Sequence, residues 1–549
     1  MPYLNLTSKG SHRRQMMSRK LRAAVFAIAV GVSVLSLLHA QTGSSETPNR
    51  LTPNERRGKE IYLRGTSASG REITALLNDI EVPASTVPCA GCHGLRGEGK
   101  TEGGVTAGNL TWNNLIKPYG HTHPSGRKHG PFTESAFIRA VVNGVDPAGN
   151  NLVVAMPHYK LTAEDMADLI AYVKRLDTDL DPGLTDNTIT VGVVLPSSGP
   201  LADTSTAMKD VFNAYFDNVN SRGGIFGRKI QVRFADVGAG GAATASVAQS
   251  FAQKEQVFAF VGGLSAGADE QLAAVARNDE IPFIGPSTLL PKIENPVNRY
   301  LFYLLPGVAE QAAALVNFAT TQAELQQASF AIVYADGSLS TAAATAAEDR
   351  AKKLGRVVQV KQSFASNSFD AKAVVQDLKS KNVGAVFLFG TGSEPADLLR
   401  EAAAVGWAPH VFALGIMAGK DLPSATPEFK DKIYLAFPTV PSDISKDGLQ
   451  EFRALQEKYK FAARHTAAQL SGFAAAKVFV EALTRAGKDL SRDKLITTLE
   501  GFYDYETGVT PHITFGPNRR VGAAGAYVIP LEDVQRGVAD ANHWVTAGN

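Results

Sequence analysis

The only two cysteines of the chain lie in one five-residue stretch, CAGCH, which holds Cys89, Cys92 and His93. The C-x-x-C spacing places both thiols on one turn, and the adjacent histidine reaches out from the same side. C-x-x-C-H is the signature of covalent heme c attachment, where each thiol bonds a vinyl group and the histidine binds the iron. Since no other cysteine occurs in the 549 residues, the rest of the fold must form without a disulfide framework.

A thioredoxin-like redox pair is the alternative for this motif. Such a pair needs no adjacent histidine and is expected within a β-α-β pattern. The surrounding sequence instead predicts helices at residues 54–64 and 132–142, and a last helix that begins at Thr162 with acidic residues first and basic residues at its end. The pattern therefore favours one covalently bound heme.

The first 40 residues have the three parts of a secretory signal peptide. Six basic residues and no acidic ones precede an apolar run, Ala23–Leu38, and Leu38-His39-Ala40 suits cleavage after Ala40. The run of 16 residues is shorter than the roughly 20 that a spanning helix needs. We expect export to the periplasm; an uncleaved anchor is the alternative.

Charge excludes one class of partner. Loss of residues 1–40 takes the net charge from +2 to −4, so the mature chain is mildly acidic. Nucleic-acid binding would need a basic surface, and none is indicated.

Met156-Pro157, in AMPHY, precedes the last predicted helix, LTAEDMADLIAYV. With CAGCH ahead of them, these motifs resemble class I cytochromes c over residues 51–178. The resemblance implies an all-α domain in which Cys89 and Cys92 hold the heme, His93 is the proximal iron ligand and Met156 the distal one. A His/Met pair suits electron transfer to a redox partner protein, such as a periplasmic dehydrogenase or another cytochrome.

Other side chains compete for metal-binding roles in this segment. Met166 lies on the apolar stripe of the last helix and is expected in the core, whereas His158 is a second candidate for the distal position. Three further histidines occur in HTHPSGRKH. The stretch is predicted to be a solvated loop rather than a metal site, because the spacing fits no zinc pattern; these histidines are His121, His123 and His129.

From residue 188 onwards, predicted strands alternate with helices, after a polar linker at residues 179–187. Strand–helix alternation indicates doubly wound parallel sheets covered on both faces, and some 360 residues exceed one such domain. We therefore expect a two-lobed α/β fold over residues 188–549. The predicted strands are residues 188–195, 229–235, 257–262, 281–285, 329–334, 357–361 and 385–389.

Four ordered landmarks resemble the type I periplasmic binding proteins of the branched-chain-amino-acid kind. They are LPSSGPLAD, NSRGGIFGRKIQV, FVGGLSAGADEQLAAVARNDEIPFIGPST and VFLFGTGSEPADLLREAAAVG. The resemblance implies a small-molecule ligand in a cleft between lobes, three crossing segments as a hinge, and an ABC permease as a potential partner. We place the crossings near Pro306, Pro438 and Tyr505.

Loops after strands are expected to line this cleft. The candidate ligand-binding residues are Ser198, Ser265, Ala266, Ser287, Thr288, Leu339, Thr391 and Ile416. In the amino-acid binders, several of these positions are polar and clamp the two charges of the ligand. In this chain the corresponding positions are occupied by the apolar residues Ala266, Leu289 and Ile416. They cannot pair the charges of an amino acid, and burying an unpaired charge is costly. The sequence therefore predicts a ligand that is not a free α-amino acid.

Three functions remain for the whole chain. The favoured one couples electron transfer to ligand binding in a redox pathway, because a plain transport receptor needs no heme. The second is a substrate-binding receptor of an ABC transporter with an ancillary heme. The third, an enzyme acting through the heme, is disfavoured: Met156 would close the iron site, and no hydrolase elbow, P-loop or H-E-x-x-H occurs.

Overall fold

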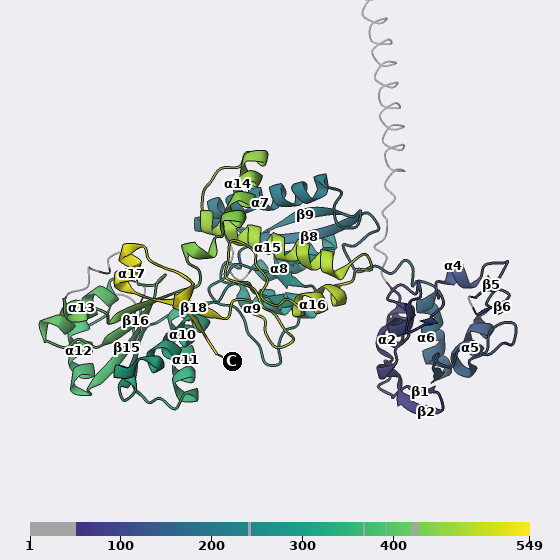
Figure 1. The fold of residues 1–549 in the computed structure, drawn as a ribbon, viewed down its shortest axis with the longest axis horizontal. Coiled ribbons are helices and arrows are strands. Elements are labelled where there is room, and N and C mark those ends of the chain that lie inside the picture. Colours follow the sequence, from purple (N-terminus) through teal and green to yellow (C-terminus); the bar gives the residue numbers. More distant parts are fainter. Residues whose placement is uncertain are drawn as a thin grey trace, which may run out of the picture. The chain divides into compact units, whose positions relative to one another are not determined.

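The computed structural model describes residues 51–548, with gaps at 124, 240–242, 366–367, 391, 419–421 and 423–426. The predicted signal peptide, residues 1–40, lies outside the described residues. The chain divides into two compact units, one ending at Asp179 and one beginning at Leu180 (Figure 1). No helix in the described part of the chain has the length and apolar character needed to span a membrane.

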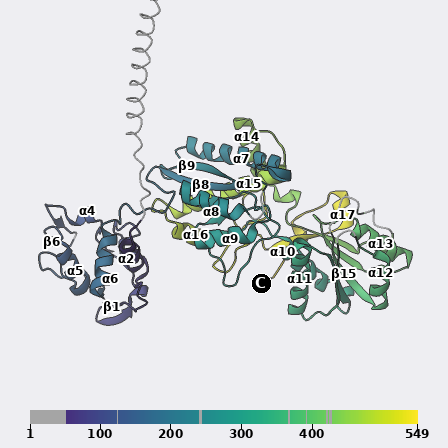
Figure 2. The same cartoon turned by 180° about the vertical axis from the view of Figure 1, so that it is seen from behind.

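Two crossing helices, α2 (Pro53–Arg64) and α6 (Ala163–Val173), form the centre of the first unit (Figure 2). A capping box between Thr52 and Glu55 starts α2, and Thr162 caps α6 as the sequence predicts. The helices touch at Gly58, where an added Cβ would lie 2.0 Å from the carbonyl oxygen of Asp168. Only glycine allows this close crossing.

Shorter elements complete this unit: α3 (Cys89–His93), α4 (Trp112–Leu115), α5 (Glu134–Asn143), β1 (Thr74–Leu77), β2 (Ile80–Pro83), β3 (Thr101–Glu102), β4 (Val105–Thr106), β5 (His121–Thr122), β6 (Lys128–His129) and β7 (His158–Lys160). The prediction of an all-α domain omitted these strands. β1 pairs with both β2 and β7 in a small antiparallel sheet. Asn78 and Asp79, with φ of 51° and 67°, form the two-residue turn between β1 and β2.

The predicted linker, residues 179–187, packs against the second unit over part of its length. Leu184 is buried in the core of the second unit. The Asp181 carboxylate accepts a hydrogen bond from the backbone N–H of Arg492, at 2.6 Å, and the Thr185 carbonyl accepts one from Arg228. The segment therefore belongs to the second unit, because its leucine and its carbonyls have partners there.

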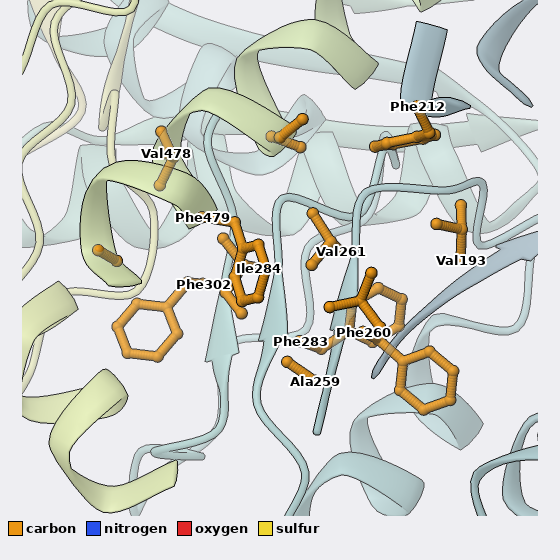
Figure 3. Close-up of a cluster of buried hydrophobic side chains, with 14 of the residues drawn as sticks. Val193, Phe212, Ala259, Phe260, Val261, Phe283, Ile284, Phe302, Val478 and Phe479 are labelled. Carbon is orange, nitrogen blue, oxygen red and sulfur yellow. The ribbon is translucent and has the colours of Figure 1, made fainter. Parts of the chain in front are cut away.

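The second unit contains two sheets. The first is parallel, in the order β12-β11-β10-β8-β9. Its strands are β8 (Thr188–Leu195), β9 (Lys229–Asp236), β10 (Ala259–Val261), β11 (Phe283–Ile284) and β12 (Leu301–Phe302), and its core takes side chains from α7 (Ala202–Ser221), α8 (Thr244–Glu255), α9 (Asp269–Asn278), α14 (Lys446–Tyr459), α15 (Thr466–Ala486) and α16 (Arg492–Glu500). Figure 3 shows Val261 and Ile284 of adjacent strands beside Phe479 of α15.

The second sheet has the order β14-β13-β15-β16-β17-β18-β19, of which β18 and β19 run antiparallel to their neighbours. Its strands are β13 (Ser329–Ala335), β14 (Val358–Phe364), β15 (Val383–Phe389), β16 (His410–Leu414), β17 (Ile433–Phe437), β18 (Gly525–Pro530) and β19 (Trp544–Thr546), and its helices are α10 (Val308–Thr321), α11 (Ser338–Lys353), α12 (Ala371–Ser380), α13 (Glu394–Ala404) and α17 (Leu531–Arg536).

Alternate residues of β13 enter different cores. Phe330 and Ile332 pack in the core with α10 and α11, whereas Ala331 and Val333 pack in the core with α12 and α13. Because successive side chains of a strand point to opposite faces, a continuous apolar run of this kind requires helices on both faces. The predicted doubly wound fold class is confirmed.

The chain passes between the two sheets three times. Pro306 lies between β12 and α10, and Pro438 follows β17, so each of them stands at a passage between the sheets. Tyr505 does not: it exchanges two backbone hydrogen bonds of 2.9 Å with Ile513 and packs against the first core. The third crossing follows Ala523, just before β18, because Phe502 and Phe515 hold residues 502–515 in the first core.

Candidate functional site

The CAGCH motif forms the short helix α3. Pro88 precedes it in an extended conformation, and Gly94 ends it at a φ of 82°. The hydroxyl of Tyr62, on α2, donates a 2.7 Å hydrogen bond to the Gly94 carbonyl. This bond anchors the motif to the central helix of the unit, so α3 has a fixed position relative to the core.

The two thiols have different surroundings. Cys92 is exposed, and Cys89 is partly buried; neither is in a disulfide. Burial raises the pKa of the Cys89 thiol to about 11, despite a hydrogen bond with the Tyr159 hydroxyl. Both sulfurs are free for chemistry, and Cys89 is held as a neutral thiol at neutral pH.

His93 is buried, with 7% of its surface exposed. Its Nδ1 lies 2.7 Å from the carbonyl oxygen of Gly108. A carbonyl only accepts, so Nδ1 carries the proton and Nε2 the lone pair. Burial lowers the pKa of His93, which favours the neutral imidazole that a metal requires. No sequence signal pointed to Gly108, fifteen residues along the chain.

Met156 is partly buried and packs against the core of the first unit. Tyr159, three residues later on β7, links this segment to the motif. Its hydroxyl donates a 2.5 Å hydrogen bond to the Val87 carbonyl and contacts the Cys89 thiol. The fold thus brings the Met156 loop and α3 together, although about 65 residues separate them in sequence. Sequence reasoning missed Tyr159.

The competing side chains have other surroundings. Met166 is buried in the core of the first unit, as predicted. The His158 ring lies against Gly144, where an added Cβ would come within 2.1 Å of its Nε2. That packing places the His158 ring at the C-terminal end of α5.

The HTHPSGRKH histidines do not form the solvated loop that was predicted. They lie on the β5–β6 hairpin, and His129 is only 8% exposed. The ring centroids of His121 and His129 are 5.2 Å apart, and those of His123 and His129 are 5.1 Å apart. Strand pairing, which the stretch gave little reason to expect, gathers the three rings.

In the second unit, the candidate contacts of the first sheet follow its strands. Ser265 is buried, and its N–H bonds the Ser287 carbonyl at 3.4 Å, so the loops after β10 and β11 touch. The Ser287 hydroxyl also bonds Ser471 of α15 at 2.6 Å. Ala266 has a φ of 48°, a strained value for alanine that marks this loop as a tightly specified turn.

The remaining candidates are more scattered. Ser198 is exposed after β8, and Thr288 is partly buried after β11. Leu339 is partly buried and packs against the core with α10 and α11, and Ile416 is 59% exposed after β16. Thr391 lies outside the described residues.

One charged side chain at this edge of the second sheet was missed. Glu394 begins α13, directly after β15, and its carboxylate accepts a 2.6 Å hydrogen bond from the Gly392 N–H. The E-P-A-D sequence at the start of a helix was the available signal. The strand ends of the second sheet therefore include a carboxylate as well as the apolar Ile416.

Comparison with known proteins defines the class. Residues 188–534 match the periplasmic binding protein family, and residues 85–177 match the cytochrome c family. The first match covers more than half of the chain, so the protein belongs to the periplasmic binding protein family and carries a cytochrome c domain ahead of that fold. A cytochrome c domain implies heme binding.

The relatives are distant. Two Leu/Ile/Val-binding protein homologs of Brucella abortus (strain 2308), numbers 7 and 8, are each 24% identical, over 54% and 60% of this chain and 77% and 84% of their own. A branched-chain amino acid ABC transporter structure from Thermus thermophilus with bound valine is 19% identical, with a TM-score of 0.48, over 67% of this chain and 97% of that one. The structure of a fatty acid ABC transporter substrate-binding protein from Thermomonospora curvata is 20% identical, with a TM-score of 0.46. The match covers 67% of this chain and 94% of that one.

Proposed function

We propose that the first unit is a c-type cytochrome in which Cys89 and Cys92 hold one heme covalently and His93 and Met156 are the axial ligands. The observation that supports this most strongly is the 2.7 Å contact between His93 Nδ1 and the Gly108 carbonyl. Metal-ligating histidines typically donate their second N–H in this way, which orients the ring and raises its basicity. The heme, when bound, supplies reversible one-electron transfer.

The residues of the chain hold and orient that group. Gly108 fixes the tautomer of His93, and burial keeps its imidazole neutral. Tyr159 positions Cys89 and the Met156 loop through its contacts with Val87 and the thiol. A thioether ligand from Met156 would raise the potential relative to other axial ligands.

For the second unit, we propose that a small molecule binds where the loops after β8, β10 and β11 face those after β15 and β16. In open α/β sheets, ligands bind outside the carboxyl ends of the strands. Buried Ser265 and its contact with Ser287 support a built site at this edge of the first sheet.

The ligand class remains the prediction from the sequence: a small molecule other than a free α-amino acid. No partner for a zwitterion is offered by Ala266, Leu289 or Ile416. The carboxylates at the strand ends of the second sheet include those of Asp336, after β13, and Glu394, after β15. The names of the Brucella relatives favour a leucine-, isoleucine- or valine-like ligand instead. A branched-chain amino acid is a zwitterion, whereas the predicted ligand is less charged or apolar, so a comparison of binding affinities distinguishes the two classes.

The whole chain would then be an exported cytochrome that couples electron transfer with a periplasmic redox partner to ligand binding, with residues 1–40 as its cleaved signal. The favoured role rests on the heme domain, because a plain receptor needs none. The alternative is a substrate-binding receptor that delivers its ligand to an ABC permease.

Two measurements on the full chain, purified from the periplasm of a heme-maturing host, test these proposals. Native mass spectrometry should show a chain that starts at Gln41 and carries one heme. An apo mass with two free thiols would refute the cytochrome assignment. An N-terminus other than Gln41 would refute the cleavage site alone.

Calorimetry with a panel of leucine, isoleucine, valine and uncharged or apolar small molecules tests the ligand class. Tight binding of a branched-chain amino acid would overturn the argument from Ala266, Leu289 and Ile416. Coupling requires that the ligand bind the oxidised and reduced protein with different affinity. Equal affinities in both states would favour the transport receptor.

A further inference from the structure

The β5–β6 hairpin of the first unit brings three histidines to one face. His121 begins β5, and His123 follows that strand directly, where its N–H continues the hairpin by donating to the Arg127 carbonyl at 2.9 Å. Because the two histidines are two residues apart in extended backbone, their side chains point to the same side. His129 is the direct cross-strand partner of His121 in this antiparallel pair. Cross-strand partners have Cβ atoms about 4.5–5.5 Å apart, which brings all three rings into one cluster.

Two of the imidazoles aim at one another. Nε2 of His123 and Nε2 of His129 are 2.9 Å apart. Two nitrogens that each lie about 2.1 Å from one ion would be about 3.4 Å apart at a tetrahedral angle and about 3.0 Å apart at a right angle. The observed separation is close to the right-angle value, so a small movement of the two rings brings both nitrogens within bonding distance of one ion. Among the divalent first-row ions, Cu²⁺ binds nitrogen ligands most tightly.

Backbone carbonyls accept hydrogen bonds from one ring nitrogen of His129 and one of His121. Nδ1 of His129 lies 2.7 Å from the Gly130 carbonyl, and Nε2 of His121 lies 2.8 Å from the Asn114 carbonyl. Each carbonyl fixes one N–H and leaves a lone pair on the other nitrogen, the arrangement typical of metal-ligating histidines. Without an ion, the Nε2–H of His123 donates to His129; binding requires only that this proton move to Nδ1 of His123.

The charges around the cluster permit a cation. Arg127, the nearest arginine along the hairpin, is paired with the buried carboxylate of Asp146 at 2.6 Å. Lys117, whose charge acts on His121, donates a 2.8 Å hydrogen bond to the Asn114 side chain. A neutral imidazole is the form that binds a metal.

We propose that the β5–β6 hairpin is a copper-binding site, separate from the proposed heme ligands, with His123 and His129 as a preorganised pair and His121 as the third ligand. Within the described residues no group of three metal-binding side chains is preformed. His121 completes the site by turning its ring, whose centroid is 5.2 Å from that of His129, and its Nε2 gives up the bond to the Asn114 carbonyl when it does so. The remaining position would be open to water.

The test uses the full heme-loaded chain without an affinity tag. Cu²⁺ is titrated against a competing chelator, and bound copper is counted by elemental analysis, where heme iron does not interfere. We expect one Cu²⁺ per chain, an axial electron paramagnetic resonance spectrum with imidazole nitrogen couplings, and binding at least tenfold weaker for Zn²⁺. Copper should also raise the melting temperature of the first unit and leave that of the second unchanged.

Variants assign the ligands. His123→Gln and His129→Gln should each weaken Cu²⁺ binding about 100-fold, and His121→Gln about tenfold. His512→Gln, which removes an exposed histidine of the second unit, is the matched control and should change nothing. The proposal fails if wild type binds no stoichiometric Cu²⁺, if binding survives in His123→Gln and His129→Gln, or if it is lost only in His512→Gln. If either variant misfolds, the nitrogen couplings and melting shift of wild type decide.

Discussion

In the first unit, the residues proposed to bind heme covalently lie within five consecutive positions, whereas the candidate ligand contacts of the second unit come from separate loops between Ser198 and Ile416. A covalent attachment needs a fixed local spacing, which one helical turn provides. A clamshell site needs strand ends from two sheets, which are adjacent in space and distant in sequence. A local site can thus be recognised as a motif, and a distributed one only as a set of loops.

The largest effect is expected from the double substitution Cys89→Ala with Cys92→Ala, which removes the local motif of the first unit and leaves the second unit unchanged. We expect essentially complete loss of covalent heme, because the chain has no other thiol. The second unit should melt unchanged and bind the same ligand. Mass spectrometry and the pyridine hemochrome spectrum measure heme, and retention of covalent heme would contradict the motif assignment.

The next largest effect is expected in the second unit. Phe387 is buried and stacks on Phe412 with ring centroids 4.9 Å apart. Phe387→Ala should destabilise this unit by about 3–5 kcal/mol, through lost burial and a cavity. Val357→Ala, at a site 74% exposed, is the control and should cost less than about 0.5 kcal/mol.

Denaturant melts followed both by the heme band and by far-ultraviolet circular dichroism separate the two units. If Phe387→Ala shifts the heme transition as much as the other, the units do not unfold independently.

Tyr159→Phe tests how far the heme site depends on tertiary contacts. Loss of the hydroxyl removes its bond to the Val87 carbonyl and its contact with Cys89, and should cost the first unit about 1 kcal/mol. Heme attachment should persist with an altered reduction potential. An unchanged potential would mean that Tyr159 has only a structural role.

The smallest effect concerns pH. Burial raises the pKa of Glu310, at the start of α10, even though the Gly307 N–H donates to its carboxylate at 2.8 Å. The pKa of Glu310 is higher in the folded protein than its unfolded value of about 4.3. The protonated carboxyl therefore stabilises the fold at a pH below that value, and this stabilisation is lost as the pH rises through the folded pKa. Glu310→Gln should therefore be most stabilising, relative to wild type, at neutral pH. The difference in melting temperature between the two proteins, measured from pH 4 to 8, should grow with pH.

Asp146 provides the contrast in the first unit. Burial acts to raise its pKa, but hydrogen bonds from Asn150, Ala148 and Arg127 outweigh burial and lower the pKa overall. Its contribution is present above about 3.9 and is lost in acid, the opposite of Glu310. In acid, the first unit should therefore lose the stabilisation that ionised Asp146 provides, whereas the second unit should gain the stabilisation that protonated Glu310 provides.

Much of the fold follows from local sequence. The strands at residues 188–195, 329–334 and 385–389 were predicted within a residue or two at most of their ends, because continuous apolar runs between helices leave little freedom. The third crossing was misplaced at Tyr505, since nothing local shows that Phe502 and Phe515 return to the first core.

The sequence by itself determined the heme motif, the helices at both ends of the first unit and the doubly wound sheets, because spacing and hydrophobic period act over neighbouring residues. Only the tertiary structure decided the tautomer of His93, the contact of Tyr159 with Cys89, and the meeting of His123 with His129. Each of these depends on a hydrogen bond or strand register between segments apart in sequence. Local patterns do not specify such pairings, because they form only when the chain is packed.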